Sequence, residues 1–489
     1  MGFLRDRVPK LLALLGLIVI TPLPVLVNHF QIATLDPDIW WHVRVGQWIL
    51  QNHAVPQNGI FSQHAMEHGW VAYSWGFEVL SAFLMRVFGL AFIPLMLGFM
   101  RSLIAFAVFM MIYRISRRFW SSWVVAVLVV MGIHLVMVIR PVLFTILFFT
   151  IQMGLIFDAR RRGSIRSLYW LPLVFWVWAN THIQFVYGLA VLLLLGACEL
   201  FAPLVARWIN QSEKTIGGNR TQWALVVVGS FVATLIGPYG TQLYGVIFRY
   251  AGNTAQYVQI QELAAMGFRN IGDYAVLLLL IGACFALGKR SLDIFSGSLL
   301  LLTSLVAFRS GRDVWFLCIP AACIIAERML ENEEQKALLR RDLLQFTATF
   351  VVGFALVFAY MRGEGLDPQS IVSGIDASYP IQATQYVSDH QLSGPMYNSF
   401  DWGGFLIFNL REHPVSIDGR NDFYGPEAFA KVQNTMNGID WKTDEDLAKA
   451  RFVLMEKGQP LARILAADPA FKLAYSDHLA VVFVRIVEK

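Results

Sequence analysis

The chain has 489 residues, of which 56% are hydrophobic and 15% are charged. Soluble domains carry about 45–50% apolar and about 25% charged residues, so this composition excludes an ordinary soluble protein and favours one dissolved largely in a bilayer. The formal net charge of +5 is small for this length and does not indicate a nucleic-acid partner. The four cysteines lie in apolar stretches, which is typical of buried hydrophobic residues rather than of disulfides or a zinc site.

Apolar segments recur from the N-terminus to residue 361. A helix needs about 20 mostly apolar residues to cross the hydrocarbon, and about eleven segments approach or reach that length. They cover residues 9–28, 88–112, 121–139, 142–158, 168–180, 183–203, 222–238, 272–288, 293–308, 313–327 and 343–361. The stretch 73–87 is amphipathic and is expected at the membrane interface. We therefore expect a mainly α, polytopic membrane protein whose transmembrane domain is 1–361.

The basic residues predict how this domain is oriented. Clusters that begin at Arg5, Arg114, Arg160, Arg207, Lys289 and Arg328 fall at every second connection. Cytoplasmic loops carry the excess of Lys and Arg, so the N-terminus is expected in the cytoplasm, in an uncleaved first span of the cytoplasmic (inner) membrane. The outward loop 29–75 and the region 362–489 are then expected outside, in the periplasm. Arg309 and Arg312 are basic residues that this scheme also places on the outer side.

The region 362–489, called the tail below, alternates helical and extended patterns. Helices are expected over residues 380–390, 426–436 and 443–450. Extended segments are expected over 396–400, 405–408, 415–417, 452–455 and 480–486. Such mixing predicts a compact extracytoplasmic α/β domain.

An acidic pair follows the first span directly, in the sequence Asp36-Pro37-Asp38. Pro37 suits the first position of an interfacial helix rich in tryptophan, with Asp36 as its N-cap. Asp38 and His42 share a face of that helix. A carboxylate at this depth could act as a general base, or hold a divalent cation against a phosphate. The plainer alternative is that Asp36 only caps, Asp38 only complements the helix dipole, and the tryptophans only anchor.

A second pattern in the same loop resembles a metal site. The sequence His64-Ala65-Met66-Glu67-His68 matches the H-x-x-E-H pattern of inverted zinc proteases, which requires a helix. Gly59 and Gly69 flank it closely, so a long helix is not expected and a chance match is favoured.

Further polar groups lie near the outer ends of the predicted spans. They are Arg140, Asn180, His182, Gln184, Tyr239, Glu262, Arg309, Arg312 and Asp313. Ionisable residues beside spans are functional hypotheses by default, although a structural role is the commoner outcome for any one of them. Several arginines that converge on one cavity would suit an anionic lipid phosphate.

Together these features resemble the GT-C superfamily of membrane glycosyltransferases. Asp36-Pro37-Asp38, with His42 and Arg44, is similar to the first outward loop of oligosaccharyltransferases and protein mannosyltransferases. Other segments are similar to a bacterial group of large uncharacterised membrane proteins assigned to this superfamily. They are Arg140-Pro141, Trp178–His182, Gly237–Gly240, Phe308–Arg312, Phe400–Gly404 and Ile417–Arg420.

The resemblance implies a polyprenyl-phosphate-linked sugar donor, an outward-facing site and inversion at the anomeric carbon. It implies Asp36 as the base or metal-binding carboxylate and Asp38 as its assistant, with or without a divalent cation (Mg²⁺ or Mn²⁺). It implies substrate-binding roles for His42, Arg44, Arg140, His182, Tyr239, Arg309 and Arg312. The acceptor is left open as a glycan, a lipid or a protein. A W-W-D-x-G motif and a second acidic pair are missing from the sequence, so neither asparagine-linked transfer nor strict metal dependence is implied.

Two other classes of function fit a polytopic chain. A transporter or flippase of a lipid-linked substrate would be expected to show repeated halves and polar groups at the midplane. The sequence shows no internal repeat, and its polar groups gather near the outer face, which favours the enzyme. A non-catalytic scaffold of the cell envelope is the third possibility.

Overall fold

The computed structural model describes residues 2–23, 36–66, 69–209, 215–252, 264–288, 293–329, 340–364 and 368–486. The chain divides into two compact units. The helical unit consists of Met1–Leu26, Leu95–Thr241 and Ile260–Met361, and the loop–tail unit consists of Val27–Pro94, Gln242–Gln259 and Arg362–Lys489. Several residues used above lie outside the described ranges: Glu67, His68, Glu262, Lys289, and residues 24–28 of the first predicted span.

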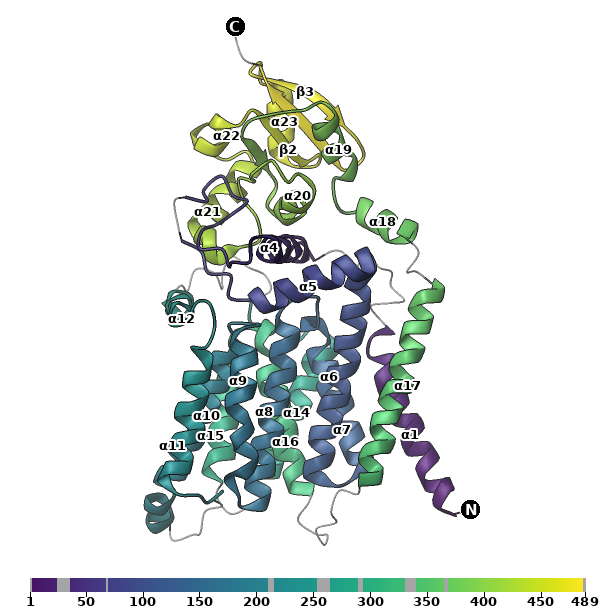
Figure 1. The fold of residues 1–489 in the computed structure, drawn as a ribbon, viewed down its shortest axis with the longest axis vertical. Coiled ribbons are helices and arrows are strands. Elements are labelled where there is room, and N and C mark those ends of the chain that lie inside the picture. The colour runs from purple at the N-terminus through teal and green to yellow at the C-terminus, as the bar shows by residue number, and fades with distance from the viewer. Residues whose placement is uncertain are drawn as a thin grey trace. The chain divides into compact units, whose positions relative to one another are not determined.

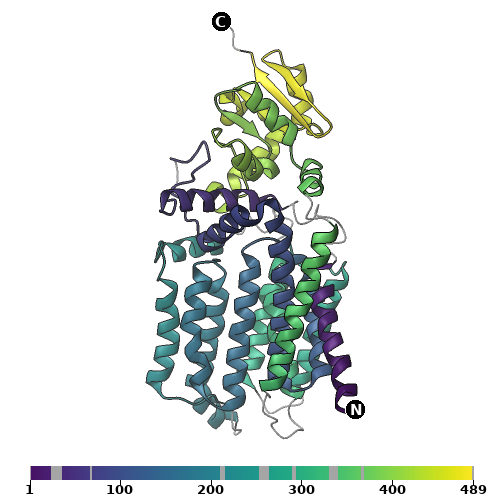
Figure 2. The ribbon, with the colours of Figure 1, turned by 45° about the vertical axis from the view of Figure 1, so that its right-hand side comes forward.

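Helices stand at all the positions where apolar spans were predicted. They are α1 (Gly2–Ile20), α6 (Phe92–Ser116), α7 (Phe119–Ile133), α8 (Val142–Arg162), α9 (Leu171–Ala179), α10 (Phe185–Ile209), α11 (Arg220–Thr234), α14 (Ile271–Gly288), α15 (Ile294–Arg309), α16 (Trp315–Met329) and α17 (Arg340–Glu364). Figures 1 and 2 show the helices of the helical unit running side by side.

Length and hydropathy together, counted over each helix with the 3-10 turn that continues it, separate these helices into two groups. Among the described residues, six helices are long and apolar enough to cross a membrane, which fits a multi-pass membrane protein. The others include α15, with 16 residues, which is about 24 Å long at the helical rise, against a hydrocarbon core of about 30 Å. The predicted total of about eleven spans therefore stays a prediction.

Helix α16 lies at the centre of the helical unit. It packs against α7, α8, α14 and α15. Its side chains from Trp315 to Cys323 are all buried. A helix that is apolar on every side is stable only where neighbours cover it all round, and these four helices do so.

The loop–tail unit combines helices with one small sheet. Its helices are α4 (Asp38–Asn52), α5 (Trp75–Phe88), α12 (Gln242–Gly252), α18 (Pro368–Asp376), α19 (Ile381–Asp389), α20 (Gly403–Asn409), α21 (Asn421–Met436), α22 (Glu445–Lys449) and α23 (Pro460–Ala467). Its strands are β1 (Met396–Asn398), β2 (Phe452–Glu456), β3 (Phe471–Ser476) and β4 (Ala480–Arg485). The strand order is β1-β2-β4-β3, with β1 and β2 parallel and the other pairs antiparallel.

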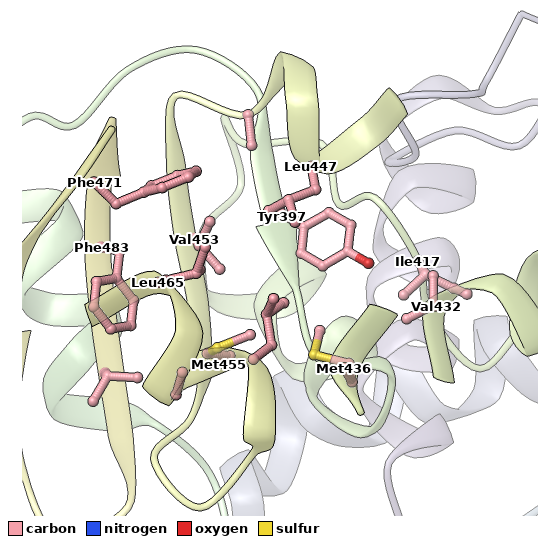
Figure 3. Packing of buried hydrophobic residues seen from close by; sticks show 14 residues of the cluster. Tyr397, Ile417, Val432, Met436, Leu447, Val453, Met455, Leu465, Phe471 and Phe483 are labelled. Atoms are coloured by element: carbon pink, nitrogen blue, oxygen red, sulfur yellow. The ribbon is translucent and has the colours of Figure 1, made fainter. Parts of the chain in front are cut away.

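The core of the tail lies between this sheet and its helices, as Figure 3 shows for Val453, Phe483, Leu465 and Met436. Most predicted tail elements are confirmed, and α21 is interrupted at Gly425, directly before the predicted start at residue 426. The prediction of an extended segment over 405–408 is wrong, because these residues form α20. A short buried apolar run does not distinguish a strand from a helix. The segment 415–417 contributes only an isolated bridge, from Val415 to Ser62.

Candidate functional site

The Asp36 side chain accepts a backbone hydrogen bond at the start of α4. Its side chain is 9% exposed, and its Oδ1 accepts a hydrogen bond from the backbone N–H of Asp38 at 3.0 Å. The prediction that Asp36 is the N-cap is off by one residue, because Pro37 already has helical angles and occupies the cap position. The Asp36 carboxylate nevertheless satisfies the first N–H of the helix, in the way an aspartate bonds the backbone two residues on.

Asp38 is the first residue of α4 and is half-buried. Its Oδ1 accepts a hydrogen bond from the Trp41 indole N–H at 3.1 Å. The tail approaches the same oxygen, since a Cβ added to Gly419 would lie only 2.0 Å from Asp38 Oδ1. The acidic pair is thus ordered by its own helix on one side and faces the tail on the other.

Tryptophans of α4 are covered by the tail. Trp40 is 1% exposed, and its ring lies 5.3 Å from that of Phe405 and 5.5 Å from that of Tyr379. Trp41 is buried as well. The helix was expected at the interface, and that location stays a prediction. What the sequence did not predict is that α20, far away in the sequence, packs over α4 and covers these rings (Figure 1).

The Trp402-Gly403-Gly404 motif has a steric explanation. A Cβ on Gly404 would lie 2.4 Å from the Pro37 carbonyl oxygen, and one on Gly403 would lie 2.2 Å from the Ile417 carbonyl oxygen. Only glycine permits such close backbone approach. These two glycines of the Phe400–Gly404 segment therefore let α20 pack on the start of α4.

Asp418 and Arg420 form a buried ion pair beside Asp38. Arg420 Nη2 and Nε donate to the two Asp418 oxygens at 2.7 and 2.8 Å. Both side chains are fully enclosed. Burial alone would disfavour the charged form, but the Asp418 carboxylate raises the pKa of Arg420 above its usual range. The Ile417–Arg420 segment is thus a charged structural element inside the loop–tail unit.

His42 and Arg44 have different surroundings on α4. His42 Nδ1 lies 3.3 Å from Glu78 Oε1, and both side chains are buried. The Arg44 guanidinium lies 5.1 Å from the centre of the Phe61 ring. Partial burial lowers the pKa of Arg44, and the nearby charge of Arg411 adds to this effect. Sequence reasoning missed Glu78, whose only signal was a carboxylate on an amphipathic helix.

The helical unit brings together two of its predicted site residues. His182 Nδ1 lies 2.8 Å from Thr145 Oγ1, which also accepts a hydrogen bond from the Trp178 indole. The charge of Arg312 acts on His182 and on its neighbour Asp313. Asp313 is buried and accepts hydrogen bonds from Gln184 at 3.1 Å and Tyr187 at 3.2 Å. The connections after α9 and α15 therefore form one polar cluster.

The remaining predicted residues of the helical unit lie at helix ends. Arg140 is half-buried and precedes Pro141, the N-cap of α8. Tyr239 is buried in the turn after α11. Arg309 is exposed at the last position of α15. Their roles as substrate ligands stay predictions.

Carboxylates near the start of α4 are of the type that a hard cation prefers as ligands. In the part of the chain that the structure describes, no group of three or more His, Cys, Asp or Glu side chains is arranged to hold a metal. Mg²⁺, however, commonly binds only one or two carboxylates, together with substrate phosphates and water. Asp36 and Asp38 could supply those carboxylates. Partial loss of water and the charges of Glu456 and Asp38 raise the pKa of the solvent-contacting Asp401.

An open cleft also lies within the loop–tail unit. Its volume is about 1040 Å³, and its lining includes Gln63 and His64 from the first loop and Asn409, Arg411 and His413 from the tail. None of the predicted site residues lines it. Amide, imidazole and guanidinium groups line it together with apolar side chains such as Leu392 and Leu410.

The chain was compared with protein-family models, with curated proteins and with solved structures. No protein-family model matches the chain, and no curated protein matches it. The crystal structure of ArnT from Cupriavidus metallidurans bound to undecaprenyl phosphate is similar over 96% of this chain and 98% of its own, with a TM-score of 0.47 and 12% identity. A likeness this loose transfers no property to the present chain.

Proposed function

We propose that this chain is a membrane glycosyltransferase that moves a sugar from a polyprenyl-phosphate-linked donor to an acceptor at the outer face of the cytoplasmic membrane. The observation that carries the proposal is the ordered acidic pair. Asp36 and Asp38 are held at the start of α4, one by the helix backbone and the other by an indole. The GT-C-like sequence around them and the apolar helices of the chain support the same reading.

Asp36 acts as the general base in this proposal, and Asp38 assists it. The acceptor hydroxyl attacks the anomeric carbon as the carbon–oxygen bond to the phosphate breaks. The phosphate leaves with the electron pair, and the acceptor proton passes to the Asp36 carboxylate. Attack opposite the leaving group inverts the anomeric configuration. The alternative for the same carboxylates is to hold Mg²⁺ or Mn²⁺, which would supply charge to the leaving phosphate.

The leaving phosphate needs positive charge or hydrogen-bond donors where its negative charge develops. Arg44 and His42 of the loop–tail unit are proposed for this task. A substrate-binding role is also proposed, separately, for Arg140, His182, Tyr239, Arg309 and Arg312 of the helical unit. Arg44 suits the task because its Nε and Nη1 atoms are buried without a hydrogen-bond partner. Buried N–H groups without acceptors gain most from an incoming phosphate.

The test uses the purified full chain in lipid nanodiscs with a panel of synthetic polyprenyl-phosphate hexoses and pentoses. Release of polyprenyl phosphate is followed by mass spectrometry, with and without added acceptor glycans. Asp36→Asn is expected to lower the rate by about 10²–10⁴-fold, the usual contribution of general acid–base catalysis. Asp440→Asn makes the same change on the exposed surface of the tail and is the matched control.

Equal rates for the parent, Asp36→Asn and Asp38→Asn would remove the catalytic assignment. A parent that moves the intact donor lipid between leaflets without releasing polyprenyl phosphate would instead be a flippase. A parent that does neither supports the envelope scaffold. Unfolding midpoints of all variants distinguish lost chemistry from lost folding.

A further inference from the structure

The tail turn Asp418-Gly419-Arg420 lies against the carboxylate of Asp38. We propose that this turn is a positioning element, which fixes Asp38 so that the tail forms one wall of the reaction site. Its relevance to catalysis rests on the proposed function, whereas the positioning itself can be tested without any substrate. The turn is rigid, it is anchored to the first loop, and it limits where the Asp38 side chain can lie.

The turn is rigid because its own charges lock it. Arg420 makes a two-pronged ion pair with Asp418, and its backbone N–H also donates to Asp418 Oδ1 at 3.0 Å. The hydroxyl of Tyr424 donates to Asp418 Oδ2 at 2.7 Å. Paired arginine and carboxylate forks fix geometry as well as energy, so Gly419, between the two partners, has little freedom.

The turn is anchored to the first outward loop across a long sequence distance. Arg420 Nη1 donates to the carbonyl oxygen of Ile60 at 2.8 Å. The guanidinium also stacks 4.8 Å from the Trp70 ring, whose indole N–H donates to Asp422 at 3.0 Å. Stacking and a third hydrogen bond use the planar fork in a way that lysine cannot reproduce. The turn and the loop therefore move as one piece.

The anchored turn confines Asp38. A Cβ at position 419 would lie 2.0 Å from Asp38 Oδ1 and 3.2 Å from its Cγ, well inside van der Waals contact. Trp41 holds the same oxygen by its indole N–H, and the Trp41 ring packs edge-on at 6.2 Å from Trp70. Asp38 is thus held between an indole of its own helix and the backbone of the tail. Arg420 acts on both contacts of Asp38: it holds the neighbouring Gly419, and it stacks on Trp70, against which Trp41 packs.

This confinement matters for chemistry because a misplacement of about 1 Å can lower a rate by about 10²-fold. It also gives a reason for glycine in the Ile417–Arg420 segment. Any side chain at position 419 would displace the Asp38 carboxylate, while the far end of a side chain can move without unfolding the chain. Gly419→Ala is therefore a selective probe of position. Gly458→Ala is its matched control, because a Cβ there meets nothing within 4 Å.

The experiment labels exposed carboxyl groups of the full chain in nanodiscs with a water-soluble carbodiimide and glycine ethyl ester, and reads each site by peptide mass spectrometry. Gly419→Ala is expected to change the labelling rate of Asp38, with Asp440 in the same digest as an internal reference. Gly458→Ala is expected to leave both rates at the parent values. Arg420→Lys is expected to change Asp38 labelling in the same direction as Gly419→Ala. The transfer assay is run in parallel and is expected to show a lower kcat with an unchanged donor KM for Gly419→Ala.

A double-mutant cycle of unfolding midpoints tests the Gly419–Asp38 contact independently of the labelling. Gly419→Ala should lower the unfolding midpoint of the parent, but not that of the Asp38→Ala variant, in which the colliding oxygen is gone. Unchanged Asp38 labelling together with additive midpoints would overturn the positioning role. Changed labelling with normal transfer would support the positioning role and refute a catalytic role for Asp38, so the two proposals fail separately.

Discussion

The two units of this protein are ordered by different kinds of contact. In the helical unit, each predicted apolar segment coincides with a helix, and neighbouring helices cover each other's apolar surfaces. In the loop–tail unit, the decisive contacts join residues more than three hundred positions apart, such as Arg420 with Ile60 and Trp70 with Asp422. Local pattern therefore predicts the first unit well. The second depends on a few polar and steric contacts that a sequence pattern does not contain.

The largest expected effect comes from breaking the ion pair of the loop–tail unit. Arg420→Met leaves Asp418 buried without its counter-charge, which typically costs about 3–5 kcal/mol. We expect the first loop and the tail to become sensitive to limited proteolysis together, while the helices of the helical unit stay protected. Arg463→Met, on an exposed residue of α23, is the control. A variant as resistant as this control would show that the pair does not hold the unit together.

Predictability follows the same division. The long apolar runs of α6, α8 and α10 sufficed to locate these helices, because runs of bilayer length have few alternative interpretations. Asp36-Pro37-Asp38 was likewise located at a helix start, within one residue. The burial of Trp40 by the tail was not predicted, because nothing in its local sequence reveals that Phe405 covers it.

Glycines in the tail indicated close contacts, but the sequence alone did not show which residues they contact. Gly403, Gly404 and Gly419 were noticed within motifs, yet their partners are the Ile417 carbonyl, the Pro37 carbonyl and the Asp38 carboxylate. A glycine indicates that another group can approach the backbone closely, but it does not identify that group. Glu78 and Asp313 were similar cases, because their burial depends on which helix faces them.

A smaller effect is expected from pH acting on Asp422. Burial raises the pKa of Asp422 to about 6, although its hydrogen bond from Trp70 opposes the shift. Between about pH 4 and pH 6 the folded state therefore binds more protons than the unfolded state, so stability falls as pH rises through this window. The full shift corresponds to at most about 3 kcal/mol, and to less because the side chain is only partly buried.

Asp422→Asn should remove that slope, because the amide oxygen still accepts from Trp70 but does not titrate. The check is the unfolding midpoint of the parent minus that of Asp422→Asn, measured from pH 4 to pH 7 in one detergent. The difference should decrease with pH and level off above about pH 6. A flat difference would mean that Asp422 ionises in the folded chain as it does in the unfolded one. Asp440→Asn, which removes an exposed carboxyl, is the matched control.

The smallest effect tests the helical unit, where neutral polar contacts supplement apolar packing. Thr145→Val keeps the shape of the side chain but removes the hydroxyl that accepts from Trp178 and pairs with His182. Thr150→Val makes the same change one turn further along α8, where the hydroxyl only bonds the Ile146 carbonyl of its own helix. That carbonyl retains its helical partner, so the control loses little. Thr145→Val instead removes the acceptor of the buried Trp178 indole N–H and one contact of His182. Hydrogen bonds between membrane helices average about 0.6 kcal/mol, and orphaned buried groups cost about 1–3 kcal/mol, so we expect a difference near 1 kcal/mol in detergent unfolding. Equal midpoints for the two variants would mean that the apolar surfaces alone order this part of the helical unit, which would make the contrast with the loop–tail unit sharper still.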